Sequence, residues 1–170
     1  MRAELEREYV EYVTARLPAL RRVAYQLTGD AHRGDDVVQQ ALTRLYTRWP
    51  RARGADNLDA YAHTVLVRIF LDERRLRWSR VELVAAVPEP PDPPVSGVED
   101  RVVLRAALAQ VPPRQRAVLV LRFLADRPVD EVARILECSE GTVKSQTSRG
   151  LATLRRLLGA DAYAITANGE

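Results

Sequence analysis

The chain of 170 residues has few of the side chains that build disulfides and metal sites. Its one cysteine, Cys138, cannot form an internal disulfide, which suits a reducing cytoplasm. Cys138 and the two histidines, His32 and His63, lack the spacing of a metal site. No apolar run reaches the roughly 18 residues that a membrane span needs. We therefore predict a cytoplasmic protein without a membrane segment, a metal or another cofactor.

Lysine is almost absent, and the positive charge is carried by arginine and segregated along the chain. Residues 1–80 hold 15 arginines and 11 acidic residues, and residues 81–100 hold five acidic residues and no basic one. Residues 101–160 hold 11 basic and five acidic residues, among them the single lysine, Lys144. A GC-rich coding sequence can explain many arginines but not their segregation. Two basic segments favour a polyanionic partner, because each phosphate contact releases counterions.

Apolar residues recur with a helical period along most of the chain. The segment Pro88–Gly97, "PEPPDPPVSG", interrupts the pattern because proline opposes helix formation. Pro18 lies inside the first helical pattern and can kink it. Helices are expected over 5–27, 35–49, 58–80, 98–111, 113–126, 128–137 and 140–158.

These patterns predict an all-α protein with two small helical domains. We assign residues 1–80 to the first domain and residues 99–160 to the second. A flexible, acidic and proline-rich linker, residues 81–98, joins them. Residues 161–170 are expected to form a flexible tail.

The helices at 128–137 and 140–158 are joined by a short connection, which is typical of a helix-turn-helix. Ser139 is a favourable N-cap for the second helix. Because Val143 and the later leucines are expected to pack inward, short polar and cationic side chains remain on the outer arc. Such side chains can pair with base edges or phosphates. They are Thr142, Lys144, Ser145, Gln146, Thr147 and Arg149.

Both halves resemble one protein family. The stretch "LAQVPPRQRAVLVLRFLADRPVDEVARILECSEGTVKSQTSRGLATLRRLL" resembles the promoter-reading domain of the bacterial extracytoplasmic-function (ECF), or group IV, sigma factors of the sigma-70 superfamily. In the first half, "LTGDAHRGDDVVQQALTRLYTRW" resembles the polymerase-binding helix of the family, and "LDAYAHTVLVRIFLDERRLR" its promoter-melting helix. The resemblance extends over residues 8–158. It implies an alternative sigma factor that binds core RNA polymerase, recognises −35 and −10 elements, nucleates DNA opening and catalyses no reaction.

The resemblance also implies a polymerase-binding set on the helix at 35–49. These residues would dock on the clamp of the largest polymerase subunit, where a carboxylate and amides suit a basic partner. The family commonly has Glu at the position of Gln40, so one charge contact differs here. The set is Asp36, Gln39, Gln40, Leu42 and Arg44.

A second implied set belongs to the −10 element and its melted strand. Asn57 and Tyr61 would line a pocket for an unstacked base, and cations would follow the strand. The family often has Trp at Tyr61 and Asn at Arg68, so local hydrogen bonding differs. The residues that would follow the strand are Arg68, Arg74, Arg75, Arg77 and Trp78.

In the second domain the resemblance places three arginines, Arg114, Arg116 and Arg122, beside the −35 duplex as phosphate clamps. Arg122 has an alternative role, since it can pair with Glu131 inside the helix-turn-helix. The apolar "VLVLRFL" segment would contact the flap of the second-largest polymerase subunit. The resemblance leaves open an anti-sigma factor as a further partner.

Three other functions are alternatives to this one. A helix-turn-helix regulator that binds DNA without polymerase explains the second half but not "DDVVQQALTRLYTRW". An enzyme acting on nucleic acid would need carboxylates at metal spacing, a phosphate-binding glycine loop or a Ser/His/Asp set, and the sequence offers none of these. A helical interaction protein, such as a regulator of another sigma factor, would lack specific DNA binding by residues 99–160.

Overall fold

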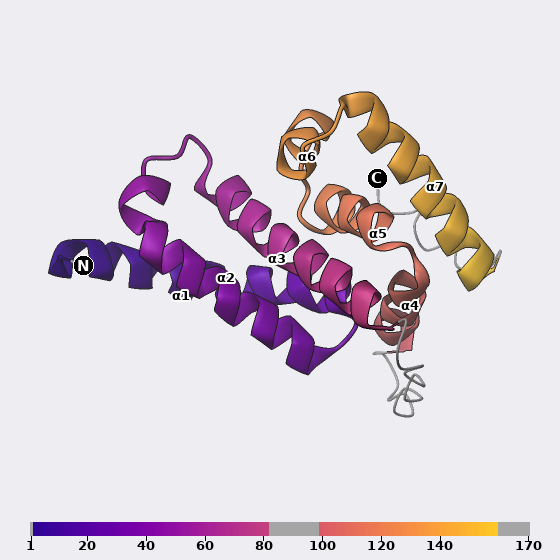
Figure 1. Cartoon of the computed structure of the whole chain (residues 1–170), viewed down its shortest axis with the longest axis horizontal. Coiled ribbons are helices and arrows are strands. Elements are labelled where there is room, and N and C mark those ends of the chain that lie inside the picture. The colour runs from indigo at the N-terminus through magenta and orange to yellow at the C-terminus, as the bar shows by residue number, and fades with distance from the viewer. Residues whose placement is uncertain (1, 82–98, 160–170) are drawn as a thin grey trace.

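The computed structural model describes residues 2–81 and 99–159, and their side chains except those of residues 77–81, 99 and 100. Within these ranges the chain forms helices and no strand, which confirms the all-α prediction (Figure 1). Residues 82–98 of the predicted linker, most of the predicted tail and the side chains of Arg77 and Trp78 lie outside the described residues. The helices are α1 (Ala3–Thr28), α2 (Ala31–Ala52), α3 (Leu58–Val81), α4 (Glu99–Gln110), α5 (Pro113–Leu119), α6 (Val129–Leu136) and α7 (Glu140–Leu158), and a π-helical turn, η1 (Val120–Leu124), continues α5.

A short turn folds α2 back onto α1. Gly29 ends α1 with a positive φ of 72°, a conformation that glycine adopts without steric cost, and its N–H donates to the carbonyl of Tyr25. Asp30 then caps α2 by accepting a 3.2 Å hydrogen bond from the N–H of Arg33. That hydrogen bond also lowers the pKa of Asp30. The turn allows α1, α2 and α3 to pack as a three-helix bundle (Figure 1).

Helix α2 continues three residues beyond its predicted end at Trp49. Pro50 removes one backbone donor, but Trp49 and Ala52 are almost fully buried. The Trp49 ring packs edge-on against Tyr9 at 5.4 Å between centroids and lies 5.5 Å from Tyr12. Burial of this aromatic cluster favours continuing the helix more than the lost hydrogen bond disfavours it.

The second half contains the predicted helix-turn-helix, formed by α6 and α7. Glu137 is the C-cap of α6 and has a positive φ of 54°, and Ser139 is the N-cap of α7. The Ser139 hydroxyl accepts a 3.0 Å hydrogen bond from the N–H of Thr142, which confirms the predicted N-cap. Helix α7 approaches α5 closely at Gly150, where an added Cβ would lie 2.9 Å from Leu119.

The predicted helix over 113–126 changes its hydrogen-bonding pattern halfway. After Leu119 the chain makes wider turns, and the N–H of Ala125 donates to the carbonyl of Val120. The Arg122 guanidinium holds this end by donating to the carbonyl of Arg127 at 2.8 Å. The wider turn leaves Phe123 58% exposed.

The two halves share one hydrophobic core. Leu66 and Phe70 of α3 belong to the same buried cluster as Leu121 and Ile135 of the second half. Figure 1 shows the second half lying over α3 and over the end of α1. The packed arrangement therefore rests mainly on apolar burial.

Arg116 of α5 is the polar centre of this packing and is only 2% exposed. Its guanidinium donates to the carbonyl of Leu27 at 2.7 Å, at the end of α1, and to those of Ala109 and Val111 at 2.8 and 2.9 Å, at the end of α4. The negative poles of two helix dipoles thus converge on one cation. Burial, with the charges of Arg74 and Arg33, lowers its pKa to about 10, so it remains charged at pH 7. The prediction that Arg116 clamps DNA phosphates is therefore wrong for this arrangement, because its donors are used inside the core.

Replacing Arg116 should destabilise the protein strongly. Arg116→Met keeps the length of the side chain but leaves three carbonyl groups without their donor, at an expected cost on the order of 3 kcal/mol. Arg114→Met is the matched control on the same helix and should cost about 1 kcal/mol or less, because Arg114 is exposed and makes a single 3.2 Å bond to Leu136. Chemical denaturation of the full chain measures both. Equal losses in the two variants would contradict the assignment.

His63 of α3 is a second buried polar group between the halves, 6% exposed, and its Nδ1 has no partner among the described residues. Burial lowers the pKa of His63 to about 4, and the positive charges of Arg127 and Arg16 act in the same direction. The carboxylate of Asp59 opposes them. The imidazole is therefore neutral at pH 7.

The free energy of unfolding should consequently decrease as the pH is lowered from about 6.5 to 4. In this window the unfolded chain binds a proton at His63 that the folded chain does not, so the free energy of unfolding drops by about 2 kcal/mol from pH 7 to pH 4.5. His63→Gln should remove this part of the drop in equilibrium denaturation. His32→Gln, at an exposed position, should keep it. A drop that is unchanged in His63→Gln would refute the assignment.

Candidate nucleic-acid interface

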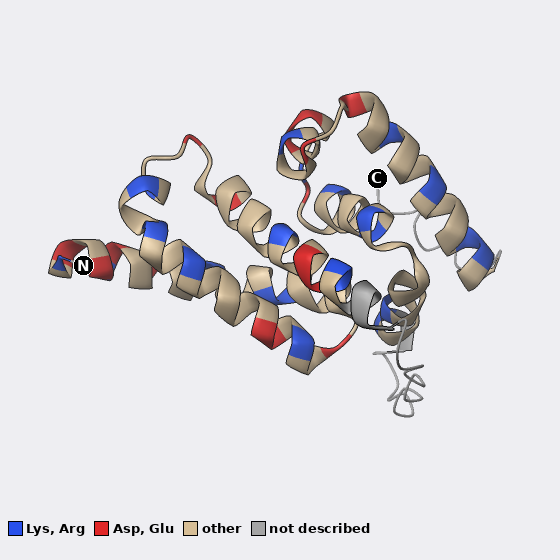
Figure 2. Ribbon diagram, viewed as in Figure 1, with Lys and Arg blue, Asp and Glu red and all other residues tan. Residues whose placement is uncertain are grey.

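The exposed arc of α7 carries short polar and basic side chains. Val143 is fully buried and anchors the helix, while Lys144, Ser145 and Arg149 are exposed. Thr142 is half-buried at the N-terminal end, where its hydroxyl contacts that of Ser139 at 2.9 Å. Basic residues continue into the last turn of α7 (Figure 2). This arc offers cations and hydroxyl groups to a duplex.

Two members of the predicted α7 set turn away from this arc. Gln146 is half-buried and faces a cleft between the two halves, and its Oε1 atom is buried without a partner among the described residues. Thr147 is half-buried and donates to the carbonyl of Val143 at 2.7 Å. In the packed arrangement neither side chain is fully available to a base edge.

Six arginines from both halves line the cleft, together with apolar residues and two acidic ones. Figure 2 shows basic residues on the C-terminal part of α3 and on α5, to either side of it. The first half contributes three arginines predicted for the −10 element, and the second half contributes Arg114 as well as Gln146. The structure thus brings members of two predicted DNA-binding sets into one place. The three arginines of the first half are Arg68, Arg74 and Arg75.

Two acidic residues of the second half bind predicted −10 residues directly. Glu131 of α6 accepts a 2.9 Å hydrogen bond from Asn57. Glu137 pairs with Arg68 at 2.7 Å. We call these two contacts the interdomain latch. Glu137 was missed by sequence reasoning, because an exposed acid carries no signal of a partner 69 residues away.

Two of the −10 candidates, Asn57 and Tyr61, lie at the start of α3. Asn57 also caps α3, since its Oδ1 accepts a 2.9 Å bond from the N–H of Ala60. Tyr61 is half-buried and packs against the core. Its ring is therefore held in place near the start of α3.

The alternative pairing of Arg122 with Glu131 is not what the structure has. Arg122 is half-buried and bonds the carbonyl of Arg127. Glu131 instead contacts Asn57 and, at 3.5 Å, the guanidinium of Arg127. The reason is the π-helical turn, which directs Arg122 toward the end of its own segment.

The polymerase-binding candidates form a separate polar face on α2. Asp36, Gln39 and Arg44 are exposed. Gln40 is exposed and donates to Glu73 of α3 at 2.8 Å, a partner that sequence reasoning missed. Leu42 is half-buried and packs against the core beneath this face. Together with Thr43 and Glu73, the four polar residues line a shallow hollow.

Comparison with known proteins shows to which family the chain belongs. The family model for sigma-70 region 2 matches residues 12–80, and the model for sigma-70, region 4 matches residues 101–154. The chain is 36% identical over 157 residues to the RNA polymerase sigma-E factor of Streptomyces coelicolor, covering 89% of this chain and 86% of that protein. It is 34% identical over 144 residues to the ECF RNA polymerase sigma factor SigL of Mycobacterium tuberculosis, covering 81% of each.

Solved structures have a similar fold. The sigma factor RpoE, in its complex with the anti-sigma factor NepR from Bartonella quintana, superposes with a TM-score of 0.72 at 25% identity, over 91% of this chain and 98% of that one. CnrH, in complex with the cytosolic domain of CnrY, has a TM-score of 0.64 at 20% identity over 92% of this chain and 90% of that one, and supports the fold.

The fold and the two matched regions define a sigma-70 transcription initiation factor, which is not a family of catalytic enzymes. Within that class, the chain belongs to the ECF sigma factors. It is an alternative sigma factor that directs promoter-specific transcription initiation. Its assignment to group IV stays a prediction. Across residues 2–81 and 99–159, no helix has both the length and the apolar character that crossing a membrane requires.

Proposed function

We propose a division of labour within this sigma factor. The polar face of α2 binds the clamp of core RNA polymerase, and the exposed Phe123 in η1 contributes to a contact with the flap. Asn57, Tyr61 and the arginines of α3, with Arg77 and Trp78, recognise and melt the −10 element. The exposed arc of α7, with Arg114, reads the −35 duplex. The protein acts in the cytoplasm and catalyses no reaction itself.

The observation that carries this proposal is the separation of the α2 face from the α7 arc. The α2 face and the α7 arc are both exposed and lie on different helices of different halves. A carboxylate and amides on α2 suit a basic protein partner, whereas Lys144 and Arg149 on α7 suit phosphates and guanine edges. An anti-sigma factor is a candidate further partner, because the similar RpoE structure contains one.

The packed arrangement cannot read both promoter elements at once. Elements centred about 25 base pairs apart lie roughly 85 Å apart along B-DNA, at 3.4 Å for each pair. In the structure the two halves touch at the interdomain latch, at 2.7 and 2.9 Å. We therefore infer that the halves separate before the promoter is bound. Separation would also release Arg68, Asn57 and Gln146 for DNA.

In vitro transcription with purified core polymerase tests the proposal. On GC-rich genomic DNA, the protein should create new start sites that share a pair of upstream motifs, as read by sequencing the 5′ ends. Sequence-specific binding by the protein alone, without new starts, would favour an ordinary helix-turn-helix regulator instead.

Two substitutions should separate polymerase binding from promoter reading. Lys144→Ala should weaken binding to the −35 duplex about five- to tenfold and flatten its salt dependence by about one unit, because one phosphate or base contact is lost. Asp36→Arg should weaken binding to core polymerase through charge repulsion and leave duplex binding unchanged. Anisotropy with labelled duplex and with labelled core measures both. Loss of core binding in Lys144→Ala would refute this division.

Removing the interdomain latch should open the free protein. The double variant Glu131→Gln, Glu137→Gln removes the negative charge from two contacts worth about 0.5–1 kcal/mol each, so the separated form should rise about five- to thirtyfold. Small-angle scattering should then show a larger radius of gyration, and −35 duplex binding should strengthen accordingly.

Asp130→Asn is the matched control for that variant. Asp130 is an exposed acid on the same helix whose partner, Arg134, lies within α6. The Asp130→Asn substitution removes a charge near the DNA-binding helix but removes no contact between the halves. Equal gains in duplex affinity for Asp130→Asn and the double variant would mean that charge alone, and not opening, is responsible.

A further inference from the structure

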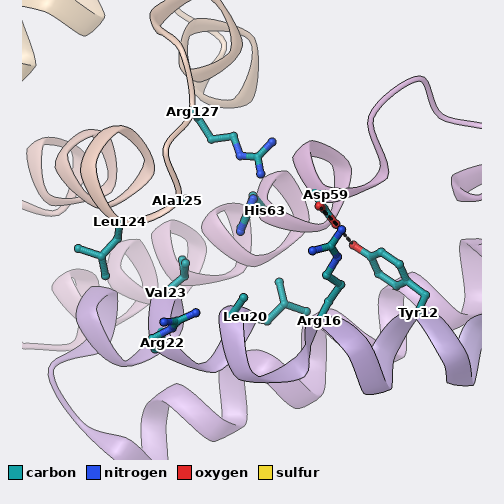
Figure 3. Close-up of a pocket in the computed structure, with 11 residues that line it drawn as sticks. Tyr12, Arg16, Leu20, Arg22, Val23, Asp59, His63, Leu124, Ala125 and Arg127 are labelled. Atoms are coloured by element: carbon teal, nitrogen blue, oxygen red, sulfur yellow. Dashed lines mark hydrogen bonds and ion pairs between the residues drawn. The ribbon is translucent and has the colours of Figure 1, made fainter.

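A small cavity of about 220 Å³ lies between α1, α3 and the connection from η1 to α6 (Figure 3). It is distinct from the arginine-lined cleft and from the α2 face. The first half lines it with Arg16 and Arg22 of α1 and His63 of α3, and the second half with Arg127. None of the functions proposed above uses this cavity.

The cavity carries an excess of positive charge. Three arginines line it against one carboxylate, Asp59. Both oxygens of Asp59 are already engaged, one at 3.1 Å from Arg16 and the other by a 2.9 Å bond from the Tyr12 hydroxyl. Asp59 therefore leaves the charge of Arg22 without a carboxylate in the cavity wall, while Arg127 has a single long ion pair, at 3.5 Å, with Glu131 outside the cavity lining.

Two buried nitrogens in the cavity wall have no acceptor. The Nδ1 atom of His63 and the Nε atom of Arg127 are both buried without a hydrogen-bond partner among the described residues. Figure 3 shows the Arg127 guanidinium directed toward the His63 ring. His63 is 6% exposed, so its ring depends on groups inside the cavity for a hydrogen-bond partner. Leaving buried polar atoms without partners is costly, so a ligand that offers acceptor oxygens to both nitrogens would be stabilised here.

The missing group should be a small oxyanion. A guanidinium and an imidazole offer N–H donors and no acceptor toward such a ligand once the ring carries its proton on Nδ1. Arginine binds phosphate with charge-assisted hydrogen bonds. A cavity of about 220 Å³ holds a phosphate group with at most a small substituent, whereas drug-sized ligands occupy about 300–1,000 Å³.

We propose that this cavity binds inorganic phosphate or the phosphate group of a small metabolite, held by Arg127 and His63 with Arg16 and Arg22 at its rim. Because the binding groups come from both halves, the ligand stabilises the packed arrangement by mass action. Phosphate then opposes the separation of the halves that promoter binding requires. This regulatory consequence rests on the proposed function, whereas the binding itself does not.

Phosphate binding can be measured on the full-length free protein without polymerase or promoter. Inorganic phosphate at ten times its Kd should raise the melting temperature by about 4 °C relative to chloride at equal ionic strength. Arg127→Met should abolish this difference. Arg134→Met is the matched control, because Arg134 lies on α6 with an exposed side chain that pairs with Asp130. The same rise in Arg127→Met and in the unsubstituted protein would overturn the proposal.

A second measurement keeps the proposal testable if Arg127→Met does not fold. In the unsubstituted protein, nitrogen NMR of the His63 ring should show its pKa rising from about 4 when phosphate is added, since a bound anion favours the imidazolium. Chloride should leave that pKa where it is. Failure of phosphate to move it would overturn the site.

A competition experiment distinguishes a small phosphate from the backbone of nucleic acid. A ten-nucleotide single strand should not displace phosphate as observed by phosphorus NMR, because the cavity is too small for a polymer to enter. Displacement by the oligonucleotide would instead assign the cavity to the DNA interface and overturn a small-molecule role.

Discussion

The relative position of the two halves of this sigma factor depends on one buried guanidinium. Arg116 donates hydrogen bonds to carbonyl groups at the ends of α1 and α4, and it pairs with no carboxylate among the described residues. A buried cation needs hydrogen-bond acceptors, and here two helix ends supply three of them. Because α1 belongs to the first half and α4 to the second, this single side chain sets the relative position of the two.

The consequence of that packing is a conflict between stability and function. Apolar burial between α3 and the second half favours the packed form, while the proposed reading of two distant promoter elements requires the halves to separate. The exposed polar contacts around this core, such as Arg68 with Glu137, are individually weak. These contacts change the equilibrium between the packed and separated forms by less than the apolar burial does. A ligand in the His63 cavity, which is lined by both halves, would shift that balance toward the packed form.

Much of the local structure was predictable because it depends on near neighbours in the chain. The helical period located the seven helices, and the cap at Ser139 followed from a short hydroxyl before a polar helix. The end of α2 was missed, because the burial of Trp49 against α1 depends on a distant segment. Arg116 was misassigned for the same reason: an arginine among other arginines gives no sign of being buried.

By itself, the sequence determined the all-α class, the order of the helices and the polar arc of α7, since helical period and capping are local properties. Only the tertiary structure decided which polar residues face solvent and which face the other half. Gln146 turns into the cleft, Asn57 meets Glu131, and His63 is enclosed beside Arg127. Those outcomes depend on how two amphipathic surfaces dock, and docking is set by shape and by buried hydrogen bonds between residues far apart in the chain.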